Sequence, residues 1–216
     1  MNALKAHINQ KHKTFISLFW ALLFSFLLLA IRIKLNGSLR FLFLVWNLFL
    51  ACIPFAITFY LSSRSKHKPI NFIIWFMIWL LFLPNAPYII TDLIHLKWSN
   101  TPYLWLDILL VTSFALNGLI LFYLSIRDMK SKLLEFLSNS KTSIVMLSVF
   151  LLTGFGVYLG RFLRFNSWDL LNHQNKLIQD ILIIITHQKQ HFEAWLFTIT
   201  FASFLYITYQ FFKKRA

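Results

Sequence analysis

The chain has 216 residues, of which 58% are hydrophobic and only 13% are charged. An ordinary soluble domain has about 25% charged residues, so this composition excludes a typical soluble globular protein. The net charge of +14 would suit a nucleic-acid-binding protein. The basic residues, however, cluster beside the ends of long apolar runs, where topology and anionic headgroups explain them better. We therefore expect the lipid bilayer and its anionic headgroups as partners, and no nucleic acid.

Six apolar runs are each long enough to cross a hydrocarbon core about 30 Å thick. They predict an all-α, polytopic membrane helix bundle that forms one integral membrane domain over residues 1–216. The expected spans are 15–33, 39–61, 70–90, 103–126, 143–162 and 192–212. Cys52 is the only cysteine, which excludes an intramolecular disulfide and a cysteine-based zinc site.

The distribution of lysine and arginine predicts the orientation of these spans. If the N-terminus is cytoplasmic, the inside segments hold 13 basic residues and the outside segments hold 8. The positive-inside rule then places both termini in the cytoplasm.

Two connections between spans have a character of their own. Residues 127–141 alternate charged and apolar side chains, which predicts a short helix on the inner surface. Residues 172–190 form the longest connection, in which Leu177, Ile181 and Ile184 keep helical spacing. This amphipathic segment either lies on the outer surface or enters the membrane as a re-entrant segment.

The third span contains the sequence FLPNAPYIITDLIHL, residues 82–96. Pro84 and Pro87 each lack a backbone N–H and clash with the preceding turn, so they predict a broken helix. Lipid offers no hydrogen-bond partner to the freed carbonyl groups, and Asn85 is well placed to supply one. Irregular backbone is tolerated at this depth only against protein or water, so we expect the break to face inward.

Acidic and aromatic side chains follow this break. Tyr88, Asp92 and His95 are spaced i, i+4 and i+7, which predicts one face of a resumed helix. Asp107 lies about one turn inside the fourth span. Ionisable residues at such depths are costly and usually partnered. The alternative is that Asp92 reaches interfacial water and His95 is an ordinary loop residue.

A basic cluster, GRFLRFNSWDL, occupies residues 160–170 at the outer end of the fifth span. Arg161 and Arg164 share a helix face. They either extend to lipid headgroups or pair with Asp92, Asp107 or an anionic ligand. The second hypothesis predicts one outward-facing polar site shared by both clusters.

The same segment carries signals for a helix start. Asn166 or Ser167 can cap a short helix, and Asp169 then falls in its first turn, where acids favour the helix dipole. Trp168 fits an outer belt of interfacial aromatic residues. Farther along, His187 and His191 have a spacing that occurs in metal sites but is common, so we expect no metal and no cofactor.

Three segments together, residues 41–54, 82–96 and 160–170, resemble a family of uncharacterised bacterial multi-pass membrane proteins, a domain of unknown function. The resemblance implies a location in the bacterial inner membrane and implies no reaction. Its signature positions are Trp46, Asn47, Asn85, Pro87, Tyr88, Asp92, His95, Arg161, Arg164, Trp168 and Asp169.

Three classes of function fit these residues. The first is binding or transport of an anionic or lipid-like ligand at an outward-facing polar site, which we favour. The second is a structural or assembly protein whose charges hold its helices together. The third is a membrane-embedded enzyme acting on a lipid or isoprenoid-linked substrate, with Asp92 and His95 as base and orienter and the arginines holding phosphate.

Overall fold

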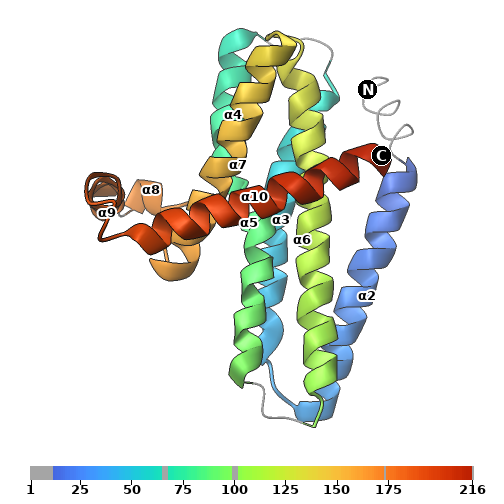
Figure 1. Ribbon diagram of the computed structural model, residues 1–216. Coiled ribbons are helices and arrows are strands. Elements are labelled where there is room, and N and C mark those ends of the chain that lie inside the picture. Colours follow the sequence, from blue (N-terminus) through green and yellow to red (C-terminus); the bar gives the residue numbers. More distant parts are fainter. Residues whose placement is uncertain (1–11, 65–67, 99–101, 173, 216) are drawn as a thin grey trace. The chain divides into compact units, whose positions relative to one another are not determined.

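The computed structural model describes residues 12–64, 68–98, 102–172 and 174–215 (Figure 1). Within these ranges every regular element is a helix. The chain divides into two compact units, residues 1–132 (unit 1) and 133–216 (unit 2).

Six helical segments of the described residues are long and apolar enough to cross a membrane, which confirms the predicted class of an all-α polytopic membrane protein. The third and fourth segments extend beyond the predicted ends, to Lys97 and Leu133. The six segments are His12–Asn36, Arg40–Ser62, Pro69–Lys97, Leu104–Leu133, Asn139–Phe162 and Phe192–Lys213.

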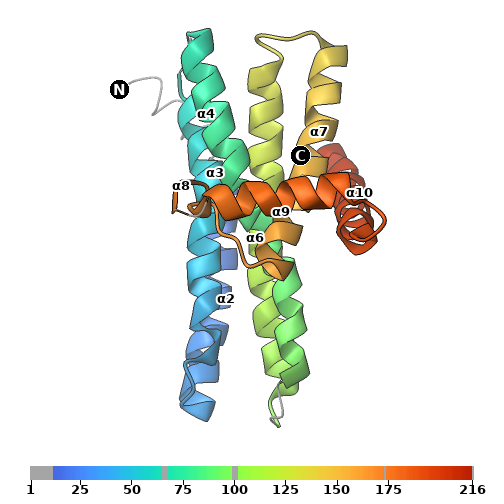
Figure 2. The same ribbon diagram turned by 90° about the vertical axis from the view of Figure 1, so that its left-hand side faces the viewer.

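Unit 1 consists of long antiparallel helices (Figures 1 and 2). The C-terminal end of α2, the start of α3, the end of η2 and the start of α6 all lie at the same end of the unit, which is at the bottom of Figure 1. Its elements are α2 (His12–Asn36), η1 (Arg40–Leu42), α3 (Phe43–Ser62), α4 (Pro69–Phe82), α5 (Asn85–Tyr88), η2 (Ile89–Trp98) and α6 (Leu104–Leu133).

Buried polar side chains join the helices of unit 1. Trp79 Nε1 in α4 donates to Ser125 Oγ in α6 at 2.7 Å. Asn117 Nδ2 in α6 donates to Ser25 Oγ in α2 at 2.8 Å. Such bonds between helices are one of the forces that hold membrane proteins together, because lipid gives little hydrophobic drive to helix association.

The third span is broken at its prolines, as predicted. Helix α4 ends at Phe82 and α5 begins at Asn85. The Ala86 N–H donates to the Leu83 carbonyl at 3.2 Å rather than to that of Phe82. Asn85 Nδ2 donates to the freed Phe82 carbonyl at 2.9 Å, so the expected role of this asparagine is confirmed.

The break faces the interior of unit 1. Leu83, Ala86 and Ile89 are fully buried. Gly118 of α6 lies so close that an added Cβ would be 2.4 Å from the Ala86 carbonyl oxygen. The missing side chain at Gly118 therefore lets the irregular backbone approach α6, in agreement with the expectation that the break contacts protein.

After the break and α5, the chain forms η2, which is a 3-10 helix rather than the expected α-helix. A 3-10 helix has three residues per turn, so side chains at i and i+3 lie above one another. Asp92 and His95 consequently share a face, although for a different reason from the predicted i, i+4, i+7 pattern. Ten residues are unusually long for this helix type.

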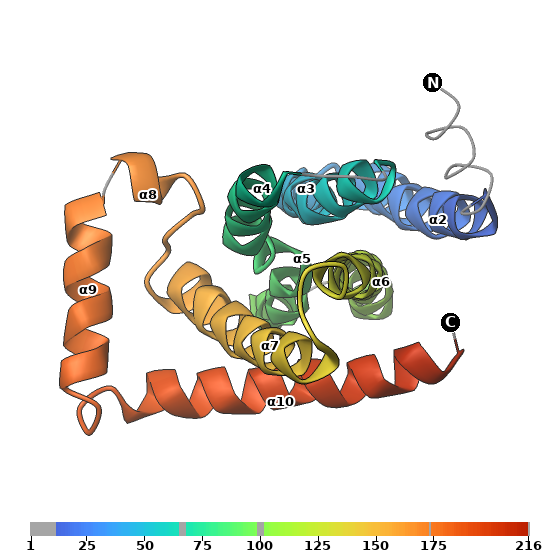
Figure 3. The ribbon, with the colours of Figure 1, turned by 90° about the horizontal axis from the view of Figure 1, so that it is seen from above.

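Unit 2 contains α7 (Asn139–Phe162), α8 (Asp169–Asn172), α9 (Gln174–Thr186) and α10 (Phe192–Arg215). Helix α10 crosses α7 at a steep angle (Figure 3). At Gly154 of α7 an added Cβ would lie 2.7 Å from the Thr198 carbonyl oxygen of α10, so glycine permits this crossing.

The structure tests both predictions about connections. The helix expected within residues 172–190 is confirmed as α9. The separate surface helix expected over residues 127–141 is wrong, because α6 continues to Leu133 and α7 begins at Asn139. Lys130 and Lys132 of this stretch instead occupy the last turn of α6, where the helix dipole favours positive charge, whereas Lys141 lies in α7.

We expect Gly118→Ala to lower the melting temperature of the detergent-solubilised protein. The new methyl group would meet the Ala86 backbone, and overpacking typically costs about 1–3 kcal/mol. Alanine favours a helix over glycine by about 1 kcal/mol, which opposes the loss only in part. Leu116→Ala, at an exposed position of the same helix, is the control. A G118A protein that melts at or above the wild-type temperature would contradict this close approach.

Candidate functional site

A buried ion pair joins α2 and α6 at one end of unit 1. Arg32 is 3% exposed and Asp107 is fully buried. Arg32 Nε donates to Asp107 Oδ1, and Arg32 Nη2 donates to Asp107 Oδ2 at 3.1 Å. The side-chain amide of Asn36 is oriented with its oxygen toward Arg32. This oxygen accepts a further hydrogen bond from Arg32 Nη1 at 2.6 Å. The partner that Asp107 was expected to need is thus Arg32.

A second carboxylate is buried nearby in the same unit. Asp92 of η2 is 1% exposed. Asn47 Nδ2 of α3 donates to Asp92 Oδ2 at 2.8 Å, and His95 Nε2 lies 3.9 Å from Asp92 Oδ1. Asp92 therefore does not simply reach interfacial water, and Asn47 connects α3 to η2.

Arg40 and His95 stand at the more accessible edge of this cluster. Arg40 is exposed, and its Nη2 donates to the His95 carbonyl oxygen at 3.1 Å. The His95 side chain is 34% exposed, and its ring lies edge-on to Phe43 with centroids 5.0 Å apart. Arg32 and Arg40 both lie over the ring of Phe41, at 5.6 and 5.7 Å from its centroid.

We call this set of residues the polar end of unit 1. Its two arginines and two aspartates balance in charge, and Lys34 in the last turn of α2 and Lys97 in the last turn of η2 add positive charge at the same end of the unit. The residues that define the polar end are Arg32, Arg40, Asn47, Asp92, His95 and Asp107.

Two of the predicted site residues lie in α5. Asn85 is engaged with the helix break through its bond to the Phe82 carbonyl. Tyr88 is half-buried, and its carbonyl oxygen accepts from Thr91 Oγ1 at 2.6 Å. Both residues therefore have local roles in forming the turn that leads into η2.

The remaining predicted residues lie in unit 2. Arg161 and Trp168 are half-buried, while Arg164 is exposed. Arg164 has a φ of +60°, a left-handed conformation that is uncommon for residues other than glycine. It lies beyond the end of α7 at Phe162, so the expectation that Arg161 and Arg164 share a helix face is wrong. The Phe165 N–H closes the helix end on the Leu159 carbonyl at 3.1 Å. Pairing of these arginines with the polar end stays a prediction.

The predicted place of Asp169 in the first turn of a short helix is confirmed, because α8 begins at this residue. The Asn166 N–H donates to Asp169 Oδ2 at 2.6 Å. This bond and the bond from the Asp169 N–H to the Asn166 carbonyl at 3.0 Å together close the turn that precedes α8. Asp169 thus has a structural role at the start of α8.

Comparison with known proteins gives one match. Residues 46–208 match the family described as Protein of unknown function (DUF1361). The chain belongs to this family. No curated protein matches the chain significantly, and no solved structure does. The matched range includes Asn47, Asp92, His95 and Asp107, whereas Arg32 and Arg40 precede it.

From the sequence of this DUF1361 protein alone, Arg32 and Arg40 are only two of the charges that flank spans. A partial signal for Arg32 was present, because Ser25 and Arg32 are polar residues spaced i, i+7 in an apolar run, and the structure shows that both are buried. A basic residue that continues the buried face of a helix indicates an internal partner rather than a lipid headgroup. Arg40 gave no comparable signal, because its contact with His95 joins residues 55 positions apart.

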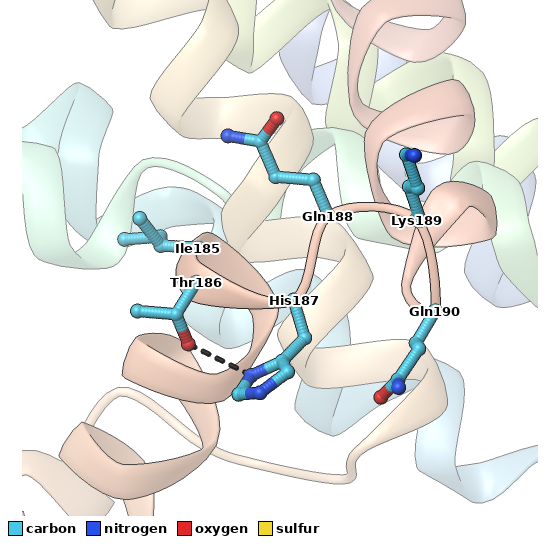
Figure 4. Close-up of a pocket in the computed structure, with 6 residues that line it drawn as sticks. All are labelled: Ile185, Thr186, His187, Gln188, Lys189 and Gln190. Atoms are coloured by element: carbon cyan, nitrogen blue, oxygen red, sulfur yellow. Dashed lines mark hydrogen bonds between the residues drawn. The ribbon is translucent and has the colours of Figure 1, made fainter.

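One surface hollow of about 350 Å³ lies in unit 2 of the DUF1361 protein, lined by residues 185–190 (Figure 4). His187 Nδ1 there lies 2.9 Å from Thr186 Oγ1. All lining side chains come from one short exposed segment, which offers no buried polar group to a ligand. Among the described residues, no group of three His, Cys, Asp or Glu side chains could hold a metal ion.

We expect Arg32→Met and Asp107→Leu to destabilise unit 1 strongly when made singly. Each leaves the other charge buried without its partner, which costs about 3–5 kcal/mol. The double variant R32M/D107L removes both charges and leaves no unpaired ion. Its melting temperature in detergent should therefore fall by much less than the sum of the two decreases caused by the single variants.

Lys34→Met is the matched control, since Lys34 is exposed in the last turn of the same helix. It should change stability by no more than about 0.5 kcal/mol. Single variants that melt like this control would show that the ion pair is not a structural requirement.

Proposed function

We propose that this DUF1361 protein binds an anionic, lipid-like ligand at the polar end of unit 1. The observation that carries the proposal is the placement of Arg40 and His95, two accessible side chains that rest on buried ones. Arg40 is tied to the His95 carbonyl, and Asp92 lies beside the His95 ring. The ligand would be held chiefly by the guanidinium group of Arg40 and the imidazole of His95.

The chemistry of Arg40 suits a phosphate or carboxylate group. A guanidinium group has five N–H donors in a planar fork that matches both anions. It can therefore hold the His95 carbonyl and donate to an anion as well. The stacking of Arg40 on Phe41 limits its rotamers, which lowers the entropy lost when a ligand binds.

The apolar surroundings of Arg40 favour a lipid-like ligand over a free anion. Leu39, Leu42, Trp46 and Phe49 are exposed between 43% and 61%. They precede or follow Arg40 along the turn into α3, so acyl or isoprenoid chains could lie against them while the anionic group contacts Arg40.

The proposal includes an orientation, with both termini in the cytoplasm and the polar end outside the bacterial inner membrane. Its support is the excess of lysine and arginine in the segments assigned to the inside. Reporter fusions after Lys68 and Lys214 should read as cytoplasmic, and a fusion after Ser99 as external. The C-terminal fusion is the most informative, because α10 has the lowest mean hydropathy of the six candidate spans, 1.2. An external signal there would refute the orientation of the last span.

A second candidate is a membrane enzyme, favoured by the separation of 3.9 Å between Asp92 Oδ1 and His95 Nε2. A buried carboxylate beside an accessible imidazole can orient the ring and stabilise its protonated form while histidine acts as general base. The burial of Asp92 reverses the roles expected from the sequence, so Asp92 would be the orienting residue and His95 the base. Arg40 would hold the anionic group of the substrate.

The binding proposal predicts that the protein purified in mild detergent carries an anionic lipid-like molecule, identified and quantified by mass spectrometry. R40Q and H95Q should each lower its occupancy at least several-fold, because each removes one direct contact. Lys13→Gln removes a positive charge at an exposed position of the opposite end of α2 and should leave occupancy unchanged.

Equal amounts of anionic lipid on the wild type and on an R40Q/H95Q variant that elutes as a folded monodisperse protein would overturn the proposal. The charges of the polar end would then serve only to hold the helices together. For the enzyme candidate, Asp92→Asn should abolish turnover of the identified molecule while R40Q raises the concentration needed for it.

A further inference from the structure

Helix α9 has two distinct sides. On a helical projection, its apolar residues other than Ile183 form one arc, in which Gln174 at the first position is the single polar residue, and Lys176 and Gln179 lie on the opposite side. The apolar arc consists of Leu177, Ile178, Ile181, Leu182, Ile184 and Ile185.

Only half of this apolar arc is covered by protein. Leu177 is 8% exposed and Ile184 is 2% exposed. Trp195 Nε1 of α10 donates to the Ile184 carbonyl oxygen at 3.2 Å, which attaches the C-terminal end of α9 to the start of α10.

The other half of the arc is open. Ile178, Leu182 and Ile185 are between 46% and 54% exposed and follow one another at i, i+4 and i+7. The result is an apolar stripe about two turns long, adjacent to the half that packs on protein and opposite the polar side.

The place of α9 in the chain indicates what covers the stripe. It lies between α7 and α10, both candidate membrane spans. Its 13 residues reach about 20 Å at 1.5 Å per residue, too short for a hydrocarbon core of about 30 Å. Lys176, Gln179 and Asp180 in the first half of the helix also conflict with immersion in the core, where polar side chains are costly.

We infer that α9 is an interfacial helix that lies along the membrane surface and inserts Ile178, Leu182 and Ile185 among the lipid chains. In this arrangement the protein covers one edge of the apolar arc and lipid covers the other. Lys176 and Gln179 face the headgroups and water, as is typical of helices in the plane of the interface. The partner of this surface is the bilayer itself, independently of any ligand at the polar end.

The test uses single labelling cysteines in the full chain, with Cys52 replaced by serine and the protein reconstituted in lipid nanodiscs. An environment-sensitive fluorophore is placed at Ile178, Leu182, Lys176 or Gln179. All four positions are exposed in the structure, so labelling should leave the fold intact, and each variant must elute as the unlabelled parent does.

Labels at Ile178 and Leu182 should show blue-shifted emission, quenching by lipids spin-labelled high on the acyl chain, and at least several-fold protection from iodide in water. Labels at Lys176 and Gln179 should show the reverse pattern. Iodide quenching at Leu182 as strong as at Gln179 would overturn the inference, because the stripe would then face water.

Two further results would also overturn it. Strongest quenching of the Leu182 label by lipids spin-labelled near the bilayer centre would indicate a re-entrant segment. Protection of the Leu182 label from both iodide and lipid quenchers would indicate that protein, such as a second copy of the chain, covers the stripe.

Discussion

The need to neutralise buried charge at the edge of a membrane organises unit 1. An isolated ion moved out of water costs several kcal/mol, so Arg32 and Asp107 are stable at their depth only together. Their bidentate bond joins the end of α2 to the start of α6, 75 residues apart in sequence. Once these two ends are fixed, η1 and the start of α3 are held beside them, with Phe41 packed against Arg32.

The broken third span depends on the same principle applied to backbone groups. Two prolines free carbonyl oxygens that lipid cannot satisfy. Asn85 repairs one of them locally, and the absence of a side chain at Gly118 lets the break lie against α6. The chain can then leave α5 as a 3-10 helix, which places Asp92 and His95 one above the other. The break thus sets the register in which Asp92 meets Asn47 of α3.

These two constraints meet at the polar end. Buried residues there connect different helices, since Arg32 bonds to Asp107 and Asn47 bonds to Asp92. Arg40 and His95 remain reachable from outside the unit. A rigid buried layer that fixes the positions of accessible hydrogen-bond donors preorganises a binding site. It is also compatible with a purely structural role, and the two differ in whether an anionic molecule accompanies the protein.

Local patterns in the sequence determined the helical elements, because each depends on residues close together in the chain. Apolar runs of sufficient length predicted six spans, the proline pair predicted the break, and the spacing of Leu177, Ile181 and Ile184 predicted α9. Asn85 and Asp169 could also be assigned, since each bonds to a group three residues away. The family was indicated in the same way, by short motifs that a match over residues 46–208 then supported.

Only the tertiary structure decided which distant side chains meet. The sequence indicated that Asp107 needs a partner but did not single out Arg32, since several arginines were available and burial, which is a property of packing, selects among them. Arg40 reaches His95 only because α3 begins and η2 ends at the same end of unit 1. The 3-10 form of η2 and the continuation of α6 to Leu133 were likewise missed. In both places packing and helix-end electrostatics outweigh the local preference that a sequence pattern can reveal.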